Sequence, residues 1–206
     1  MTLVTDNYTL LSGVTNKFDK ILEMISHDFY QQKTRHLSEI IRLSEEIRED
    51  MSKAGRDNDV FRDMEKIMLG VERLSYSIKS KVTRRVLFSK WAVNEMNVLI
   101  SNARECMDKL YYFVTSGDGE TGKWLSDRSA RCLFLCDEYN KNHIERKKKG
   151  TCYMEASIVY QRILDSFRDI FQHINCASKG ILADIDRPAS GLWFPAKELP
   201  LTITRD

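Results

Sequence analysis

Apolar residues recur along most of this chain at alternating steps of three and four positions, the spacing that gathers side chains on one face of an α-helix. The clearest case is YQRILDSFRDIFQHINCASKG, residues 160–180, where Ile163, Phe167, Ile170 and Ile174 form one apolar line. The same spacing predicts six helices, over residues 16–31, 37–51, 60–82, 89–113, 123–149 and 153–180. The chain is therefore expected to be all-α.

Breaks in the pattern separate the predicted helices. The segment TSGDGETG, residues 115–122, places three glycines among small polar residues, a composition typical of a connection. The run RKKKG, residues 146–150, puts cations in the last turn of a helix, where they favour the helix dipole, and ends in a glycine. Short connections of this kind make successive helices neighbours.

The pattern of the first half of the chain is repeated in the second half. In each half, two helices precede a third whose apolar residues recur with especially regular spacing. This third helix covers residues 60–82 in the first half and residues 156–181 in the second. Helices with such apolar lines pack nearly antiparallel, at crossing angles of about 20°. We therefore predict two tandem antiparallel three-helix bundles packed side by side, residues 16–84 and 86–182, followed by an extended C-terminal tail over residues 183–206.

Composition narrows the class of protein. The chain has 206 residues, of which 42% are hydrophobic and 30% charged, and its net charge is +2. A near-neutral balance argues against a nucleic-acid-binding protein, whose basic surface usually shows in the totals. No apolar run approaches the roughly 20 residues of a membrane span, and the N-terminus lacks the features of a signal peptide. We expect a cytoplasmic protein.

The sequence contains few groups that would carry catalytic chemistry. It has no Gly-rich phosphate loop, no serine nucleophile elbow and no Glu-x-x-His pair of a di-iron bundle, so no enzymatic activity is predicted. The histidines, at positions 27, 36, 143 and 173, are isolated in sequence and are interpreted as structural. Five cysteines suggest reduced thiols. Cys132 and Cys136 share a helix face; they are interpreted as structural residues, with metal ligation as the alternative.

The segment EYNKNHIERKKKGTCYMEASIVY, residues 138–160, resembles the second half of a PhoU domain, of the type attached to bacterial Na/phosphate cotransporters. The residues in step with that pattern are Tyr139, His143, Arg146, Gly150, Cys152, Glu155, Ala156 and Tyr160. VERLSYSIKSKV, residues 71–82, takes the place of the corresponding helix of the first half, and residues 88–100 resemble the start of the second bundle. The resemblance covers residues 17–182.

In that family, acidic residues at i and i+4 on the third helix of each bundle bind multinuclear clusters of iron, zinc or manganese. At the positions of the first acidic pair this chain has Glu72 and Tyr76, and at those of the second pair it has Arg168 and Gln172. The histidine that the family has beside the second pair is present here as His173. An arginine would repel a cation, so we expect no metal in the second bundle and no cofactor overall. Arg168 could instead hold an internal salt bridge or an anion, which is the lesser alternative.

The first bundle keeps one acidic residue of the family's pair, so Glu72 is the single weak metal candidate. Acidic residues on the preceding helix could join it: Glu45, Glu46 and Glu49. A solvated acidic face is the simpler interpretation of this group.

The resemblance implies a non-catalytic regulatory adaptor in phosphate uptake or phosphate signalling, which binds a membrane transporter or sensor protein and reaches the inner face of the membrane through that partner. The alternatives are a metal-binding helical bundle that uses the residual acidic residues, and a self-associating module such as a homodimer. Leu192, Trp193 and Phe194 of the tail either contact a partner or, as we favour, pack on the protein's own bundle. The basic segments 81–85 and 146–150 are interpreted as solvated faces.

Overall fold

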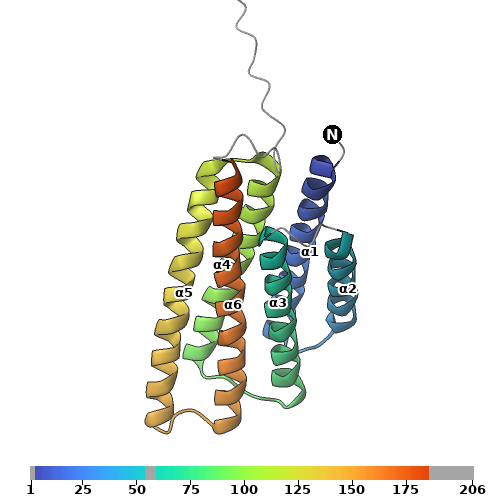
Figure 1. The fold of residues 1–206 in the computed structure, drawn as a ribbon. Coiled ribbons are helices and arrows are strands. Elements are labelled where there is room, and N and C mark those ends of the chain that lie inside the picture. Colours follow the sequence, from blue (N-terminus) through green and yellow to red (C-terminus); the bar gives the residue numbers. More distant parts are fainter. Residues whose placement is uncertain (1–2, 54–58, 186–206) are drawn as a thin grey trace, which may run out of the picture.

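The protein is all-helical in the computed structural model, which describes residues 3–53 and 59–185 (Figure 1). Its helices are α1 (Leu3–Gln31), α2 (Leu37–Lys53), α3 (Asp59–Thr83), α4 (Lys90–Ser116), α5 (Gly119–Lys148) and α6 (Met154–Ile185). No strand occurs within the described ranges. The all-α class and the six helices predicted from the apolar spacing are confirmed.

The helices run along one long axis and alternate in direction through the chain (Figure 1). α1 packs against α2 and α3, and α2 against α3; α4, α5 and α6 pack against one another in the same way. The two groups meet where α3 lies along α6 and where α1 lies along α4, and α3 and α6 share the most extensive interface. This interface joins the end of the first half of the chain to the end of the second.

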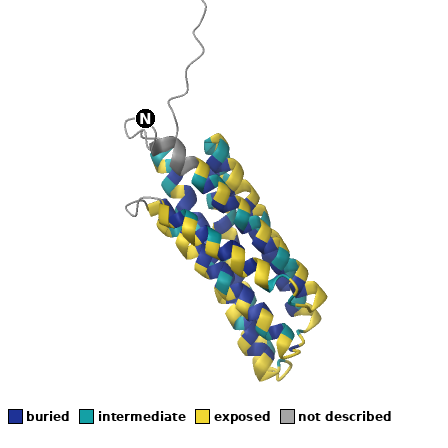
Figure 2. Ribbon diagram, turned by 90° about the vertical axis from the view of Figure 1, so that its right-hand side faces the viewer, coloured by how far each residue is buried: buried dark blue, intermediate teal, exposed yellow. Residues whose placement is uncertain are grey.

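One continuous apolar core runs through the molecule, and the predicted apolar lines supply it. Ile163, Phe167, Ile170 and Ile174 are all buried to 1% exposure or less. Phe18 of α1 and Leu99 of α4 are buried in the same core. Figure 2 shows the buried positions facing inward along the length of the bundle and the exposed ones facing outward.

The structure moves several predicted helix limits. α1 begins at Leu3 and not near residue 16, because Leu11 and Val14 continue its apolar line and are buried. α5 begins at Gly119 and not at residue 123, since the side chain of Asp118 accepts hydrogen bonds from the first free backbone N–H groups of the helix. The break in segment 115–122 is real but shorter than predicted.

The structure also defines where α4 and α6 end. Gly117 ends α4 in the left-handed conformation, with φ of 66°. α6 continues to Ile185, because Ile181 is buried and Leu182 packs against the core. The rest of the predicted tail, with Leu192, Trp193 and Phe194, lies outside the described residues.

Gly70 allows α3 to approach α6 closely. A Cβ atom at this position would lie 2.8 Å from Cγ1 of Ile170. Gly13, in the interior of α1, has no atom within 4 Å of its equivalent Cβ. We expect Gly13→Ala to raise the free energy of unfolding by about 0.5–1 kcal/mol, because alanine favours the helix. Gly70→Ala gains the same propensity but crowds the interface, at a cost of about 1–3 kcal/mol.

Urea denaturation of the two alanine variants checks this expectation. The difference between them isolates the crowding at the α3–α6 interface, because the change in helix propensity is common to both. Equal stabilisation by the two substitutions would show that α6 can move away from α3 without cost.

Candidate functional site

A cavity of about 230 Å³ lies at the end of the molecule where α5 ends and α6 begins. The connection between α3 and α4 and the connection between α5 and α6 both lie at this end (Figure 1). Leu87 and Phe88 line the cavity from the first connection, and Cys152 and Tyr153 from the second. We call this region, residues 84–92 and 143–158, the docking end.

Arg146 and Tyr160 line the cavity, and they belong to a largely buried network of polar side chains centred on Glu95, which we call the floor. Glu95 of α4 accepts hydrogen bonds from Nη1 and Nη2 of Arg146 of α5, at 2.9 and 2.6 Å. The hydroxyl of Tyr160 of α6 donates to the same carboxylate at 2.7 Å. The guanidinium also lies over the Tyr160 ring, 5.5 Å from its centroid. A two-point contact between arginine and carboxylate is among the stronger polar contacts in proteins, and here it joins three helices.

The network leaves these groups in fixed protonation states near neutral pH. Burial, and then the hydrogen bond to Glu95, raise the pKa of the Tyr160 hydroxyl. The hydrogen bond to Glu95 likewise raises the pKa of Arg146. Tyr160 therefore keeps its proton and acts as a donor to Glu95, and Arg146 keeps its charge.

His143 of α5 completes the floor. Its ring stacks on Tyr160, with centroids 4.6 Å apart, and its Nε2 lies 2.8 Å from the hydroxyl oxygen of Ser157. Burial, followed by the nearby charge of Arg146, lowers the pKa of His143, so the ring is neutral at pH 7. Ser157 does not line the cavity, and we interpret its contact with His143 as a link between α5 and α6.

The rim of the cavity exposes large apolar side chains. Leu87, Trp91, Tyr153 and Met154 are between 73% and 85% exposed, more than any other large apolar residue of the described chain. They come from both connections and from the first turns of α4 and α6. Apolar side chains gathered in this way commonly mark an interaction surface.

The docking end is also basic. Its exposed cations outnumber its exposed carboxylates: Arg84, Arg85, Lys90, Lys147, Lys148 and Lys149 against Glu145 and Glu155. Glu155 is itself 3.6 Å from Arg84. The lysines at the end of α5 also favour the dipole of that helix. The combination of cations with exposed aromatic and aliphatic side chains suits an acidic, partly apolar partner.

The structure places the family's first metal position on α3, where Glu72 accepts a hydrogen bond from Arg48 of α2. Tyr76, one turn further on, is exposed. The acidic residues of α2 have cations as neighbours as well: Glu46 lies 3.3 Å from Lys17, and Glu49 lies 3.3 Å from Lys53. Glu45 is exposed. Glu72 thus has a cation as its partner, and the structure does not bring the α2 carboxylates together around it in the described residues.

The second family position, on α6, holds internal salt bridges. Arg168 donates to Asp165 at 2.8 Å and to Asp137 of α5 at 3.1 Å, both at the surface. The salt bridge predicted as one alternative for Arg168 is therefore present within the chain. Gln172 lies 3.5 Å from the sulfur of Cys176.

The family histidine takes part in packing between the two halves. His173 Nδ1 lies 2.8 Å from Oδ1 of Asp63, so it connects α6 to α3.

The buried cysteines behave as structural residues. Cys132 and Cys136 of α5 are both buried, and Cys106 of α4 packs beside Cys132. The hydrogen bond with Cys132, together with burial, raises the pKa of Cys106, and burial raises the pKa of Cys136 to about 12. A neutral thiol is a poor nucleophile and a poor metal ligand, which supports the structural interpretation of Cys106 and Cys136. The hydrogen bond with Cys106 lowers the pKa of Cys132, so for Cys132 the interpretation rests on its burial.

Comparison with protein-family models, with curated proteins and with solved structures finds no match for this chain. In the described part of the chain, none of the helices has an apolar stretch long enough to cross a membrane. The resemblance to PhoU domains therefore stays a prediction from the residue pattern.

Proposed function

We propose that this protein is a non-catalytic, PhoU-like regulatory adaptor in phosphate uptake or phosphate signalling, and that it binds a membrane transporter or sensor through the docking end. The observation that carries the proposal is the rim of Leu87, Trp91, Tyr153 and Met154, which is highly exposed and surrounded by cations. The contacts of α1–α3 and of α4–α6 support the tandem arrangement of two three-helix bundles.

The floor of the cavity favours binding over catalysis. Glu95, Arg146 and Tyr160 are occupied with one another, and the lowered pKa of His143 leaves its ring neutral. The floor therefore gives the end of the bundle a rigid shape, while the rim supplies the apolar area and the charge. Interfaces commonly combine a few aromatic anchors with a polar surround in this way.

The partner surface that fits this end is acidic and carries an apolar side chain that enters the cavity. Lys147, Lys148 and Lys149 would steer the encounter, because complementary charge mainly speeds association. Trp91 and Tyr153 would supply most of the binding energy.

Site-specific photo-crosslinking in the native host tests the proposal. A photoreactive amino acid is placed at Trp91 or at Tyr153, and for comparison at Phe134, which is 61% exposed on the middle of α5. We expect positions 91 and 153 to form an adduct with a phosphate transporter or a sensor protein, and position 134 to form none. The double variant Lys147→Glu/Lys148→Glu should lower the adduct yield at least 10-fold.

Phosphate uptake by the same cells supplies an independent measurement. Trp91→Asp should alter uptake in the same direction as deletion of the gene. Adducts of equal yield at position 134, adducts only with a second copy of the chain, or binding only to anionic vesicles would each contradict the adaptor proposal. The second of these outcomes would favour the self-association alternative.

A further inference from the structure

Two imidazoles and one carboxylate meet where α1 ends and the chain turns into α2. Oδ1 of Asp28 lies 2.8 Å from Nδ1 of His36 and 3.8 Å from Nδ1 of His27. The three atoms that could bind a metal all lie within 4.8 Å of one another. This is the one such group of three among the residues that the structure describes.

We propose that His27, Asp28 and His36 bind a divalent transition metal, with zinc as the best fit. Two imidazole nitrogens and one carboxylate oxygen are a common zinc ligand set, with the fourth position open to water. Ligand atoms about 2.0–2.1 Å from a tetrahedral metal lie about 3.4 Å from one another. The two nitrogen–oxygen separations of 2.8 and 3.8 Å bracket that value. The ligand atoms as a group lie within 4.8 Å of one another, so a bound metal requires the two rings to move closer, and the exposed His27 side chain is free to do so.

The surrounding backbone holds the carboxylate in place. Asp28 is buried, and its Oδ2 accepts a hydrogen bond from the backbone N–H of His36 at 3.2 Å. Its Oδ1 is thereby turned toward the two rings. Gln32, with φ of 51°, reverses the chain, and the N–H of Lys33 donates to the carbonyl of Asp28 at 3.2 Å. Fixing a metal ligand by such outer contacts strengthens binding.

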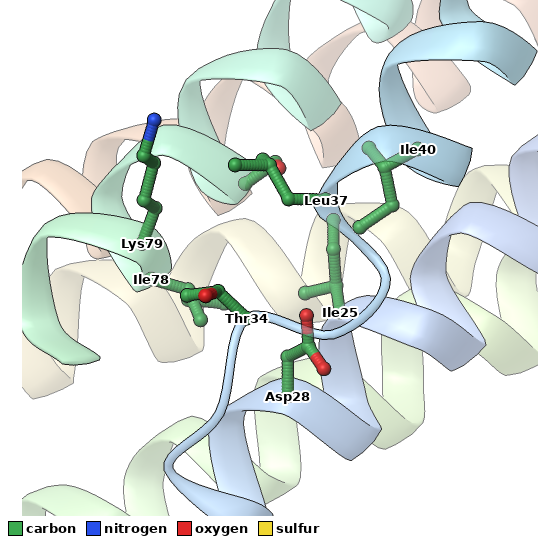
Figure 3. Close-up of a pocket in the computed structure, with 8 residues that line it drawn as sticks. Ile25, Asp28, Thr34, Leu37, Ile40, Ile78 and Lys79 are labelled. Atoms are coloured by element: carbon green, nitrogen blue, oxygen red, sulfur yellow. The ribbon is translucent and has the colours of Figure 1, made fainter. Parts of the chain in front are cut away.

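The site is open on the imidazole side and closed on the side of the core. The His27 side chain is 47% exposed, which provides a path of entry for an ion. Asp28 also borders a cavity of about 10 Å³, which has room for about one water molecule and is lined by four apolar and four polar or charged residues. Figure 3 shows Asp28 at this cavity, with the amine of Lys79 directed away from the carboxylate.

The same chain contains a natural comparison. His173 and Asp63 show the same separation of 2.8 Å between Nδ1 and Oδ1, but no third ligand joins them in the described ranges. If the contact between His36 and Asp28 were only a structural ion pair, the two sites would respond alike to zinc. The site is also separate from the docking end, because neither His27 nor His36 lines that cavity. It is distinct as well from the family positions at Glu72 and Arg168.

Zinc titration of the full chain, stripped of metal and competed against a chromophoric chelator, tests the proposal. We expect one zinc ion per chain, and affinity reduced at least 10-fold in His27→Ala, in His36→Ala and in Asp28→Asn. His173→Ala should bind zinc like the unaltered protein. His27 is the decisive position, because its exposed side chain can be removed with little risk to folding, which circular dichroism confirms.

Two further measurements support the titration. Zinc should raise the Tm of the unaltered protein and of His173→Ala, but not that of His27→Ala. Cobalt should give the visible absorption of a tetrahedral complex in the first two proteins only. Absence of zinc binding, retention of full affinity in His27→Ala, or an equal loss in His173→Ala would overturn the proposal. Retained binding would place the metal at other groups, such as the partly exposed thiols of Cys152 and Cys176.

Discussion

Replacing Glu95 by alanine is expected to lower the free energy of unfolding by about 2–3 kcal/mol. The carboxylate accepts both terminal N–H groups of Arg146 and the hydroxyl of Tyr160. Its removal leaves a guanidinium and a phenol without their acceptor at the floor of a largely buried site. A charged donor left without its acceptor in a partly buried site costs more than the hydrogen bonds contributed. The Arg146 side chain is 18% exposed and lines the cavity, so it keeps part of its hydration.

Urea denaturation of Glu95→Ala measures this cost, and Glu105→Ala is the matched control. Glu105 accepts one hydrogen bond from Arg128 at 2.9 Å, and its side chain is 45% exposed. We expect that control to lose less than about 1 kcal/mol. The double variant Glu95→Met/Arg146→Met should recover most of the stability, because it removes both charges at once. A loss below about 1 kcal/mol in Glu95→Ala would mean that water reaches the guanidinium.

Unfolding stability should respond to pH between about 8 and 10.5 through Lys81. This side chain is 1% exposed. Its Nζ donates to Oε1 of Gln32 at 2.6 Å and lies 5.1 and 5.2 Å from the ring centroids of Phe29 and Phe88. Burial lowers the pKa of Lys81 from 10.5 to about 8, because the ammonium ion loses most of its hydration.

The direction of the effect follows from proton binding. Between pH 8 and 10.5 the unfolded chain holds the Lys81 proton and the folded protein has released it, so stability rises with pH across this interval. The difference between the pKa of Lys81 in the unfolded and in the folded protein corresponds to about 3 kcal/mol of unfolding free energy. Cys136 acts in the opposite sense from about pH 9 and Tyr160 from about pH 10, because their pKa values are raised in the folded protein from 9.0 and 10.0. The rise with pH therefore belongs to the contribution of Lys81 and not to the total stability.

Comparing the unaltered protein with Lys81→Met at a series of pH values isolates the contribution of Lys81. We expect the stability of the unaltered protein relative to Lys81→Met to increase by about 2–3 kcal/mol from pH 7 to pH 10. Lys79→Met serves as the control, because Lys79 is exposed on the same helix. The difference in stability between the unaltered protein and Lys79→Met should stay constant across the pH series. A constant difference for Lys81→Met as well would mean that the amine remains charged and hydrated in the folded protein.

The spacing of apolar residues predicts the features that depend on residues close in sequence, namely the helices and the face of each helix that is buried. The apolar lines of α4 and α6 occur where expected, since each line alone specifies which face of the helix is buried. The predicted start of the first helix near residue 16 is wrong. Ser12, Gly13 and Thr15 have low helix propensity, yet Leu11 and Val14 continue the buried face. Tertiary packing outweighed local propensity at this end.

The polar sites could not be predicted in the same way. Glu95 is 51 positions from Arg146 and 65 from Tyr160, and nothing in the local pattern pairs them. A signal existed in the position of Glu95 itself, a carboxylate directly before Met96 on the buried side of α4. His36 joins His27 and Asp28 only because Gln32 adopts a left-handed conformation, which a glutamine in sequence does not indicate.

The interface between α3 and α6 affects how the protein unfolds. These two helices close the first and the second half of the chain, and each buries apolar side chains that the other covers. If only one half unfolded, its own apolar residues would become exposed, and so would the apolar face of the half that remained folded. Partly unfolded states therefore expose apolar surface on both halves, which raises their free energy. The two halves are therefore expected to unfold cooperatively, as one thermodynamic unit, although the sequence repeats its pattern twice.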